Sequence, residues 1–147
     1  YPRTMNFSSM SFGLNAIMCA DMGDLREAYQ QFIISAGMDI DEELTGRNDT
    51  RYGMHGTACG GAWMAVVFGF GGVRLHEGAL HITPRLPRGW RALNFTLTLR
   101  GETCAVTITK HSISVRCGRR ASLTLPAVLA GHAVTLRSGA TQRVRVG

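Results

Sequence analysis

A histidine flanked by glycines is the most promising candidate for chemistry in this sequence. The segment from Tyr52 to Trp63 places His55 between Gly53 and Gly56, and Thr57 follows at the start of an apolar run. Small residues let another group approach the backbone closely, and the free N–H groups at a helix start attract anions. His55 and Thr57 could therefore donate hydrogen bonds to an oxyanion. A tight loop whose glycines only permit close helix packing explains the same residues equally well.

A second group of polar side chains lies near the beginning of the sequence. Ser8, Ser9 and Ser11 precede and enter a segment with helical spacing. Hydroxyl side chains at such a position usually cap the helix, and ligand binding is the alternative role. We carry both interpretations forward for Ser8 and Ser9.

Acidic residues cluster after the second predicted helix. Asp39, Asp41, Glu42 and Glu43 could in principle supply the paired carboxylates of acid–base catalysis. They lie in a polar segment, so we interpret the cluster as a solvated helix exit. The histidines and cysteines show no metal-ligand spacing, and we expect no metal site.

The first half has the periodicity of α-helices. Asp24 to Gly37 carries apolar residues along one helical face, with Asp24 as N-cap, Glu27 positioned for a capping box and Gly37 as the stop. The segment Ser9 to Met22 has the same spacing, so the two segments predict a helical hairpin.

A third helix is predicted from Thr57 or Ala58 to Phe70. This segment is apolar on nearly all sides, so it should be buried on most of them. Three helices of this kind cannot bury one another well. We therefore expect this chain to be the C-terminal segment of a larger protein, with neighbouring helices elsewhere in it.

The second half changes to a period of two residues, which is typical of half-buried strands. Strands are predicted around residues 93–99, 104–109, 113–117, 123–125, 134–136 and 144–146. A turn centred on Lys110 and His111 pairs apolar residues with apolar residues, including Cys104 with Cys117. Because Lys-His is a poor two-residue turn, a longer loop around the same centre is favoured. Many short antiparallel strands predict a β-sandwich or barrel.

Charge is distributed unevenly along the chain. Residues 1–72 hold 4 Arg or Lys and 8 Asp or Glu, whereas residues 73–147 hold 12 and 2. This shift predicts two domains, 1–72 and 73–147. The arginines are scattered and lack an aromatic stacking platform, so we expect no nucleic-acid partner.

Neither membrane insertion nor a disulfide scaffold is expected. The longest apolar run, 62–73, is 12 residues, and a membrane-spanning helix needs about 20. Four cysteines without secretion signals are interpreted as free thiols in a reducing compartment, so the expected location is the cytoplasm. A disulfide between Cys104 and Cys117 is the alternative.

Several separated motifs share their order with those of a known family. They are Tyr1-Pro2-Arg3-Thr4, Ser8-Ser9-Met10-Ser11, Gly23-Asp24, Gly53-Met54-His55, Gly60-Gly61-Ala62-Trp63, Val67-Phe68-Gly69-Phe70-Gly71-Gly72 and Pro84-Arg85-Leu86-Pro87-Arg88-Gly89-Trp90. Together they resemble glycoside hydrolase family 65, which includes maltose, trehalose and kojibiose phosphorylases. The resemblance runs from residue 1 to about residue 117.

The resemblance implies an α+β chain: the final helices of an (α/α)6 catalytic barrel followed by an antiparallel β-sandwich. It also implies that inorganic phosphate cleaves an α-linked glucose disaccharide with inversion, giving β-glucose 1-phosphate, with no cofactor. The phosphate site of the family corresponds to Ser8, Ser9, His55 and Thr57. The general-acid glutamate lies upstream in the family, so no catalytic residue is expected here. Phosphorylases of this type are often dimers, so a homodimer is implied.

One departure from the family pattern keeps the reaction type open. Many members have an acidic residue just before the Gly-x-His step, where this sequence has Tyr52. Inverting hydrolysis, which needs a carboxylate base, is therefore an alternative to phosphorolysis. A non-catalytic sugar-binding or interaction module is the rival from a different class.

Overall fold

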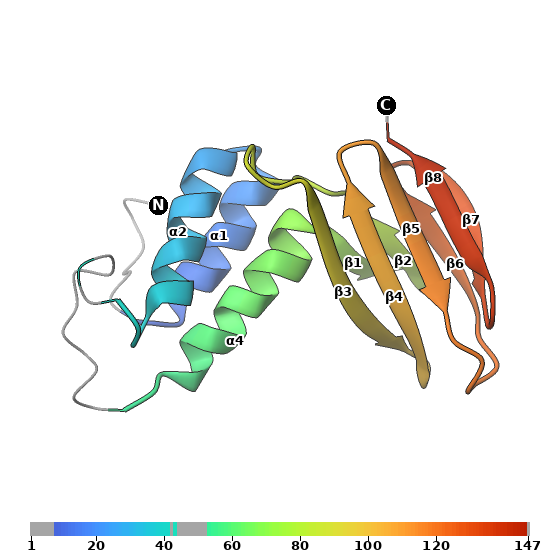
Figure 1. Cartoon of the computed structure of the whole chain (residues 1–147), viewed down its shortest axis with the longest axis horizontal. Coiled ribbons are helices and arrows are strands. Elements are labelled where there is room, and N and C mark those ends of the chain that lie inside the picture. The colour runs from blue at the N-terminus through green and yellow to red at the C-terminus, as the bar shows by residue number, and fades with distance from the viewer. Residues whose placement is uncertain (1–7, 42, 44–52, 147) are drawn as a thin grey trace. The chain divides into compact units, whose positions relative to one another are not determined.

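The computed structural model describes residues 8–41, 43 and 53–146. It divides into two compact units, Tyr1–Phe70 and Gly71–Gly147, which are described separately below (Figure 1). Helices make up the described part of the first unit, and strands make up the second. The expected α+β class, with helices followed by a sandwich, is confirmed.

The first two helices form the predicted hairpin. Helix α1 runs over Ser11–Asp21 and α2 over Leu25–Gly37. Asp24 caps α2, because its carboxylate accepts a hydrogen bond of 3.0 Å from the Glu27 N–H. The reciprocal half of the predicted capping box is absent: the Asp24 N–H donates instead to the Cys19 carbonyl at the end of α1, which ties the two helices together.

The third helix starts one residue earlier than predicted and changes its winding. Helix α4 covers Gly56–Met64, and Ala65–Phe70 continues as the π-helix η2. Its predicted burial on most sides is incomplete, because the Trp63 side chain is 52% exposed.

Glycine backbones bring α1 against α4. A Cβ added to Gly13 would lie 2.5 Å from the carbonyl carbon of Gly61, so the two helices touch backbone to backbone. Further along, Gly69 approaches Ile17. Residue numbers therefore rise together along the contact, which means that α1 runs parallel to α4 and η2.

The second unit is a sandwich of two four-stranded sheets, with orders β1-β2-β6-β7 and β3-β4-β5-β8 (Figure 1). The strands are β1 Val73–His76, β2 Ala79–Ile82, β3 Ala92–Leu99, β4 Glu102–Thr109, β5 Ser112–Cys117, β6 Thr124–Leu129, β7 His132–Arg137 and β8 Thr141–Arg145. Alternate residues of both sheets point inward and make the core, among them Leu80, Ile82, Val106, Ile108, Ile113, Val115, Leu125 and Leu129.

The predicted hairpin register is confirmed at its apolar pairs: Ile108 faces Ile113 and Val106 faces Val115. The Thr109 hydroxyl accepts hydrogen bonds from the N–H groups of His111 and Ser112, which closes the connection around Lys110. One pair departs from the antiparallel prediction, since β2 and β6 are parallel. Three strands in the other sheet separate them in sequence, and a connection of that length permits parallel pairing.

The prediction of free thiols at Cys104 and Cys117 is wrong. The two residues face each other directly in the ladder, with Cα atoms 4.1 Å apart, and a disulfide links them. Both side chains point to the same inward face, which brings the sulfurs within bonding reach. Cys19 and Cys59 are free, the first buried and the second exposed. Over the described ranges, no helix is long and apolar enough to cross a membrane.

Candidate functional site

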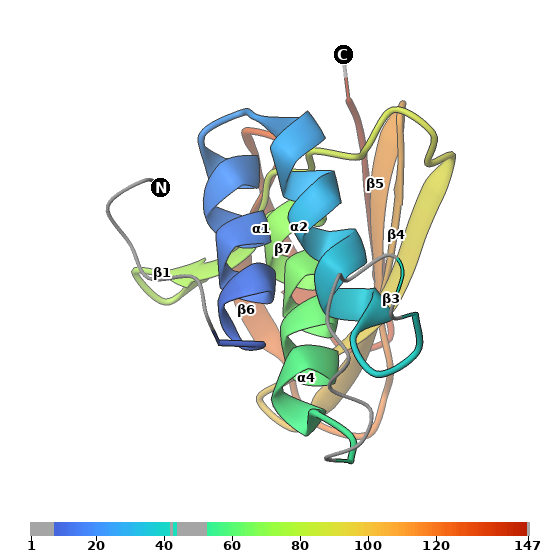
Figure 2. The same cartoon turned by 90° about the vertical axis from the view of Figure 1, so that its left-hand side faces the viewer.

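Three chain segments meet at one end of the helical unit. Because α1 and α4 are parallel, their first turns lie at the same end, together with the last turn of the antiparallel α2 (Figures 1 and 2). The Ser35 hydroxyl of α2 holds this arrangement by donating a hydrogen bond of 3.0 Å to the Ala58 carbonyl of α4. The starts of two helices, each with its partial positive charge, therefore lie near each other.

His55 is held in place by Asp39, which lies 16 residues earlier. The backbone N–H of His55 donates to one carboxylate oxygen of Asp39 at 2.5 Å, and ring Nδ1 lies 2.6 Å from the other oxygen. The Asp39 side chain is 10% exposed and that of His55 is 29% exposed. The pair thus fixes both the backbone and the ring of His55 at the start of α4.

Asp39 can reach His55 because the chain turns sharply after α2. Its backbone adopts a left-handed conformation, with φ of 66°. Aspartate tolerates this region better than most residues that carry a Cβ. The turn carries the carboxylate across to α4. Asp39 is therefore a structural partner of His55, and the interpretation of Asp39 as part of a solvated helix exit is wrong.

The electrostatics of the pair define what the imidazole can offer. The His55 backbone N–H, and after it the ring contact, hold the pKa of the Asp39 carboxyl below its ordinary value. An ionised carboxylate only accepts hydrogen bonds, so Nδ1 is the nitrogen that carries the proton in the contact. Ring Nε2 then faces away from Asp39, as an acceptor in the neutral ring and a donor in the protonated one.

The predicted serine and threonine ligands surround this end of the unit. The Ser8 hydroxyl accepts a hydrogen bond from the Met10 N–H at 3.3 Å, and its carbonyl accepts one from Ser11. Ser8 is exposed and Ser9 half-buried. Thr57 is exposed as the second residue of α4, and His55 occupies the N-cap position without a capping hydrogen bond from its side chain. Within the described residues, no hydrogen bond joins Ser8 or Ser9 to His55 or Thr57, so Asp39 and His55 form the one direct contact among the site residues.

The sequence suggests two roles for the glycines near His55, close packing of helices and close approach of a ligand. Gly61 serves helix packing, since it touches Gly13. A Cβ at Gly53, Gly56 or Gly60 would meet nothing within 4 Å. Among the described residues, close packing therefore does not require glycine at these three positions.

Four further sequence-based candidates lie between Asp39 and His55 in the chain. Asp41 and Glu43 are exposed, whereas Glu42 and Tyr52 lie outside the described residues. In the portion of the chain that the structure describes, no three His, Cys, Asp or Glu side chains are grouped as metal ligands would be.

Comparison with known proteins identifies the family. Residues 1–64 match the model of the glycosyl hydrolase family 65 central catalytic domain, and residues 73–136 match that of the family 65 C-terminal domain. The chain belongs to glycoside hydrolase family 65.

The relatives of this chain include proteins named as phosphorylases. Over 115 residues the chain is 41% identical to the kojibiose phosphorylase of Caldanaerobacter subterraneus subsp. tengcongensis, covering 78% of this chain and 14% of the relative. It is 35% identical over 112 residues to the α,α-trehalose phosphorylase of Thermoanaerobacter brockii, covering 76% of this chain and 14% of that enzyme. The chain therefore spans about a seventh of the length of these relatives.

A solved structure supports the same assignment of the fold. "Putative kojibiose phosphorylase from human microbiome" superposes with a TM-score of 0.83 at 25% identity, over 99% of this chain and 20% of that one. This chain thus shares with that structure the order of helices followed by a β-sandwich.

Proposed function

We propose that this chain forms the C-terminal part of an inverting α-glucoside phosphorylase and supplies part of its phosphate site. The observation that carries the proposal is the His55–Asp39 pair, which lies at the end of the unit where α1 and α4 both begin. Ser8 and Ser9 precede α1 at that same end. The phosphorylase relatives support the reaction type.

The proposed chemistry follows from these positions. A phosphate dianion is attracted to the two helix starts and receives hydrogen bonds from Ser8, Ser9 and Thr57 and from Nε2 of a protonated His55. A phosphate oxygen attacks the anomeric carbon from the face opposite the glycosidic bond. The new C–O bond forms as the old one breaks, and the product is β-glucose 1-phosphate. The departing oxygen takes a proton from a general acid, which the family resemblance places upstream of Ser8.

Asp39 has a positioning role in this proposal. It holds the His55 ring by Nδ1, so that Nε2 points toward the ligand in one defined orientation. Removal of Asp39 leaves His55 present but free to rotate. We therefore expect Asp39 and His55 variants to affect the same step to different degrees.

Inverting hydrolysis is a second candidate, in which the histidine of this pair would take the place of the usual carboxylate base. A histidine oriented by a carboxylate can abstract a proton from water through Nε2. In that case His55 would be the general base, and the product would be β-glucose. Phosphorolysis and hydrolysis therefore differ in what Nε2 contacts, a phosphate oxygen or a water molecule.

The test measures cleavage of kojibiose and trehalose by the full-length protein, with and without inorganic phosphate. We expect phosphate-dependent release of β-glucose 1-phosphate, and His55→Ala should lower kcat/KM about 100-fold. Asp39→Asn should lower it less, by about tenfold. His132→Ala, which changes an exposed histidine at the start of β7, is the matched control and should have no effect.

Each alternative outcome is distinct. Release of β-glucose without phosphate assigns the hydrolase, and unchanged phosphate dependence in His55→Ala contradicts the site. Absence of turnover with any α-glucosidic disaccharide favours a non-catalytic sugar-binding or interaction module. Cytoplasmic location and a homodimer stay predictions, and the Cys104–Cys117 disulfide removes part of the basis for the first.

A further inference from the structure

The outward side of the β3-β4-β5-β8 sheet carries a concentration of arginines. We call this surface the arginine face and define it by Arg116, Arg119, Arg143 and Arg145. Arg116 lies on β5, and Arg143 and Arg145 lie on β8. Arg119 follows the end of β5. All four are exposed. Among the described residues, none of them forms an ion pair with a carboxylate.

Acidic residues that could neutralise this surface are absent from it. Residues 73–147 contain 12 Arg or Lys but two Asp or Glu. Glu77 follows β1 in the other sheet, and Glu102 is 1% exposed with its side chain turned inward. The positive charge of the arginine face is therefore available to a ligand.

Two hollows lie on this face, and each is bordered by arginines and hydroxyl groups. The first, of about 620 Å³, lies between Arg116, Arg119 and the threonines Thr96, Thr103 and Thr141. The second, of about 670 Å³, is lined by Thr109, His111, Ser112, Arg143 and Arg145. Hollows of several hundred Å³ are of the size that holds one or two sugar rings.

The register of the sheet aligns these groups. Thr96 lies opposite Ala105, Ala105 opposite Arg116, and Arg116 opposite Thr141. Such a row crosses four strands over about 14 Å. Arg143 and Arg145 are two residues apart on one strand, so their side chains emerge on the same face about 7 Å apart. Two charges thus follow each other along β8, and Arg116 adds a third on the neighbouring strand β5.

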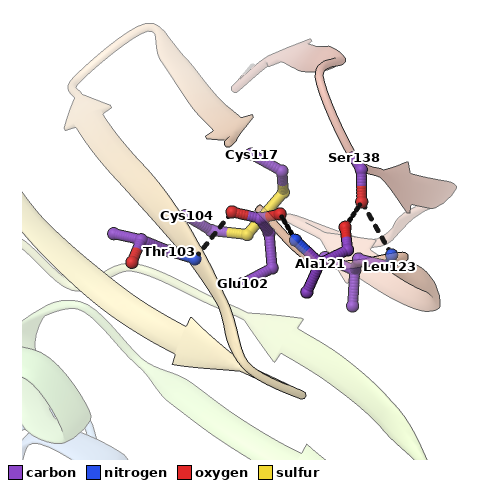
Figure 3. The surroundings of a disulfide bond; sticks show 7 residues. All are labelled: Glu102, Thr103, Cys104, Cys117, Ala121, Leu123 and Ser138. Atoms are coloured by element: carbon purple, nitrogen blue, oxygen red, sulfur yellow. Dashed lines mark hydrogen bonds between the residues drawn. A yellow bond between two sulfur atoms is a disulfide. The ribbon is translucent and has the colours of Figure 1, made fainter. Parts of the chain in front are cut away.

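Hydrogen bonds within the second unit hold the backbone around Arg119. The Glu102 carboxylate accepts hydrogen bonds from the N–H groups of Thr103 (3.0 Å) and Ala121 (2.8 Å), next to the disulfide (Figure 3). Ser138 bonds the same segment through Ala121 and Leu123 (Figure 3). The chain from Cys117 to Leu123 is therefore held on both sides.

Arg119 itself lies against a glycine. A Cβ at Gly139 would be 2.8 Å from its Nε, so the absence of a side chain at residue 139 leaves room for the guanidinium stem. Arg143 is similarly placed, with its Nη2 3.5 Å from the Ser112 hydroxyl. The contact with Ser112 orients Arg143 before any ligand arrives, which lowers the entropy lost on binding.

We propose that the arginine face binds an anionic polysaccharide, with one charged sugar unit in each hollow. Guanidinium groups pair with the sulfate, phosphate or carboxylate groups, and the threonine and serine hydroxyls bond the sugar hydroxyls. This inference does not rest on the proposed catalytic function.

The residue types on the arginine face favour an anionic polysaccharide over other polyanions. The outward positions of the four strands hold no Phe, Tyr or Trp. Single-stranded nucleic acids are bound by stacking bases on such rings. The centres of protein interfaces are enriched in aromatic residues and Met, whereas the outward positions of these strands carry Ala, Asn, Ser, Thr and Arg. Charged sugars need neither feature.

The experiment titrates the full-length protein with dextran sulfate, and with uncharged dextran and oligothymidylate of the same length. Dextran sulfate should bind with an affinity that falls as salt rises, and uncharged dextran should not bind. Arg116→Gln and Arg143→Gln should each lower the affinity about fivefold and reduce the salt dependence by about one counterion. Arg137→Gln, an identical charge change on exposed β7 of the other sheet, should leave it unchanged.

Three results would overturn the proposal. They are no binding of dextran sulfate, an equal loss in Arg137→Gln, or tighter binding of oligothymidylate than of dextran sulfate. The second would mean that net charge alone attracts the polymer, and the third that the face binds nucleic acid. Disaccharide cleavage should be normal in all three arginine variants, which separates this test from that of the catalytic proposal.

Discussion

In the sandwich, large apolar side chains from both sheets point into one core, whereas α1 of the helical unit carries four on an exposed stripe. Met10, Leu14, Met18 and Met22 recur every fourth residue and are 49%, 49%, 60% and 72% exposed. Residues four apart lie on one side of a helix. The helical unit therefore has an apolar side that water does not favour, whereas the described strands expose one large apolar side chain, Leu75.

The polar groups of the two units show the same difference. In the sandwich, the buried Glu102 has its carboxylate oxygens bonded to backbone N–H groups. In α2, the buried side-chain oxygen of Gln31 has no partner among the described residues. Buried polar atoms nearly always have a hydrogen-bond partner in native structures. The candidate site therefore lies on the unit that has both the exposed apolar stripe and the unpaired buried oxygen.

A charge on the α1 stripe should have the largest effect. If other helices cover the stripe in the full-length protein, Met18→Glu places an unpaired charge in an apolar contact and lowers the free energy of unfolding by about 4 kcal/mol. Leu75→Glu, on a sandwich residue that is 71% exposed, is the control and should change little. Urea unfolding measures both, and equal small effects would show that the stripe faces water.

Loss of the disulfide should come next. Replacing Cys104 and Cys117 together by alanine opens a loop with a sequence separation of 13. The expected loss is about 3 kcal/mol of unfolding free energy in the sandwich. Cys59→Ala, at an exposed free thiol, should have no comparable effect. Alkylation without reductant checks the premise, because labelling of Cys104 would contradict the bond.

A methyl group between α1 and α4 tests the packing of the helical unit. Gly13→Ala drives its Cβ into the Gly61 backbone and should cost about 2 kcal/mol. Gly60→Ala in α4 meets nothing within 4 Å and should be neutral or stabilising, by up to about 1 kcal/mol. Thermal unfolding compares the two. Similar melting temperatures would mean that the helices do not touch at Gly13.

The smallest effect expected is a pH dependence from Asp39. Its pKa is lowered from 3.8 in the folded chain, so its bonds to His55 stabilise the fold above that value. This contribution is lost as the pH falls further, through the folded pKa. Asp39→Asn should therefore weaken the chain at pH 6 more than at pH 3, whereas exposed Glu43→Gln should not. Urea unfolding at the two pH values makes the comparison, and an equal effect at both would contradict it.

The sequence predicted elements well wherever a repeating pattern was long. The alternation in residues 93–117 placed three strands and the register that pairs Cys104 with Cys117. Strands β1 and β2 were not predicted, because four residues with polar neighbours carry too little periodicity. The parallel pairing of β2 with β6 depends on contacts across 40 residues or more, and no local pattern contains it.

For the site, the sequence identified the histidine but not its partner. His55 stood out because glycines surround it. Asp39 lies 16 residues away among other acids, and only the left-handed turn after α2 distinguishes it. A signal was present in the segment order, since the end of an antiparallel α2 must return to the start of α4. Composition alone could not select Asp39 over Asp41.

The most direct test of the central claim is a crystal structure of the full-length protein soaked with inorganic phosphate. We predict a phosphate within hydrogen-bond distance of His55 Nε2 and of the Ser8 and Ser9 hydroxyls, with the His55–Asp39 contact intact. A phosphate bound elsewhere in the helical domain, with only water beside His55, would contradict the account.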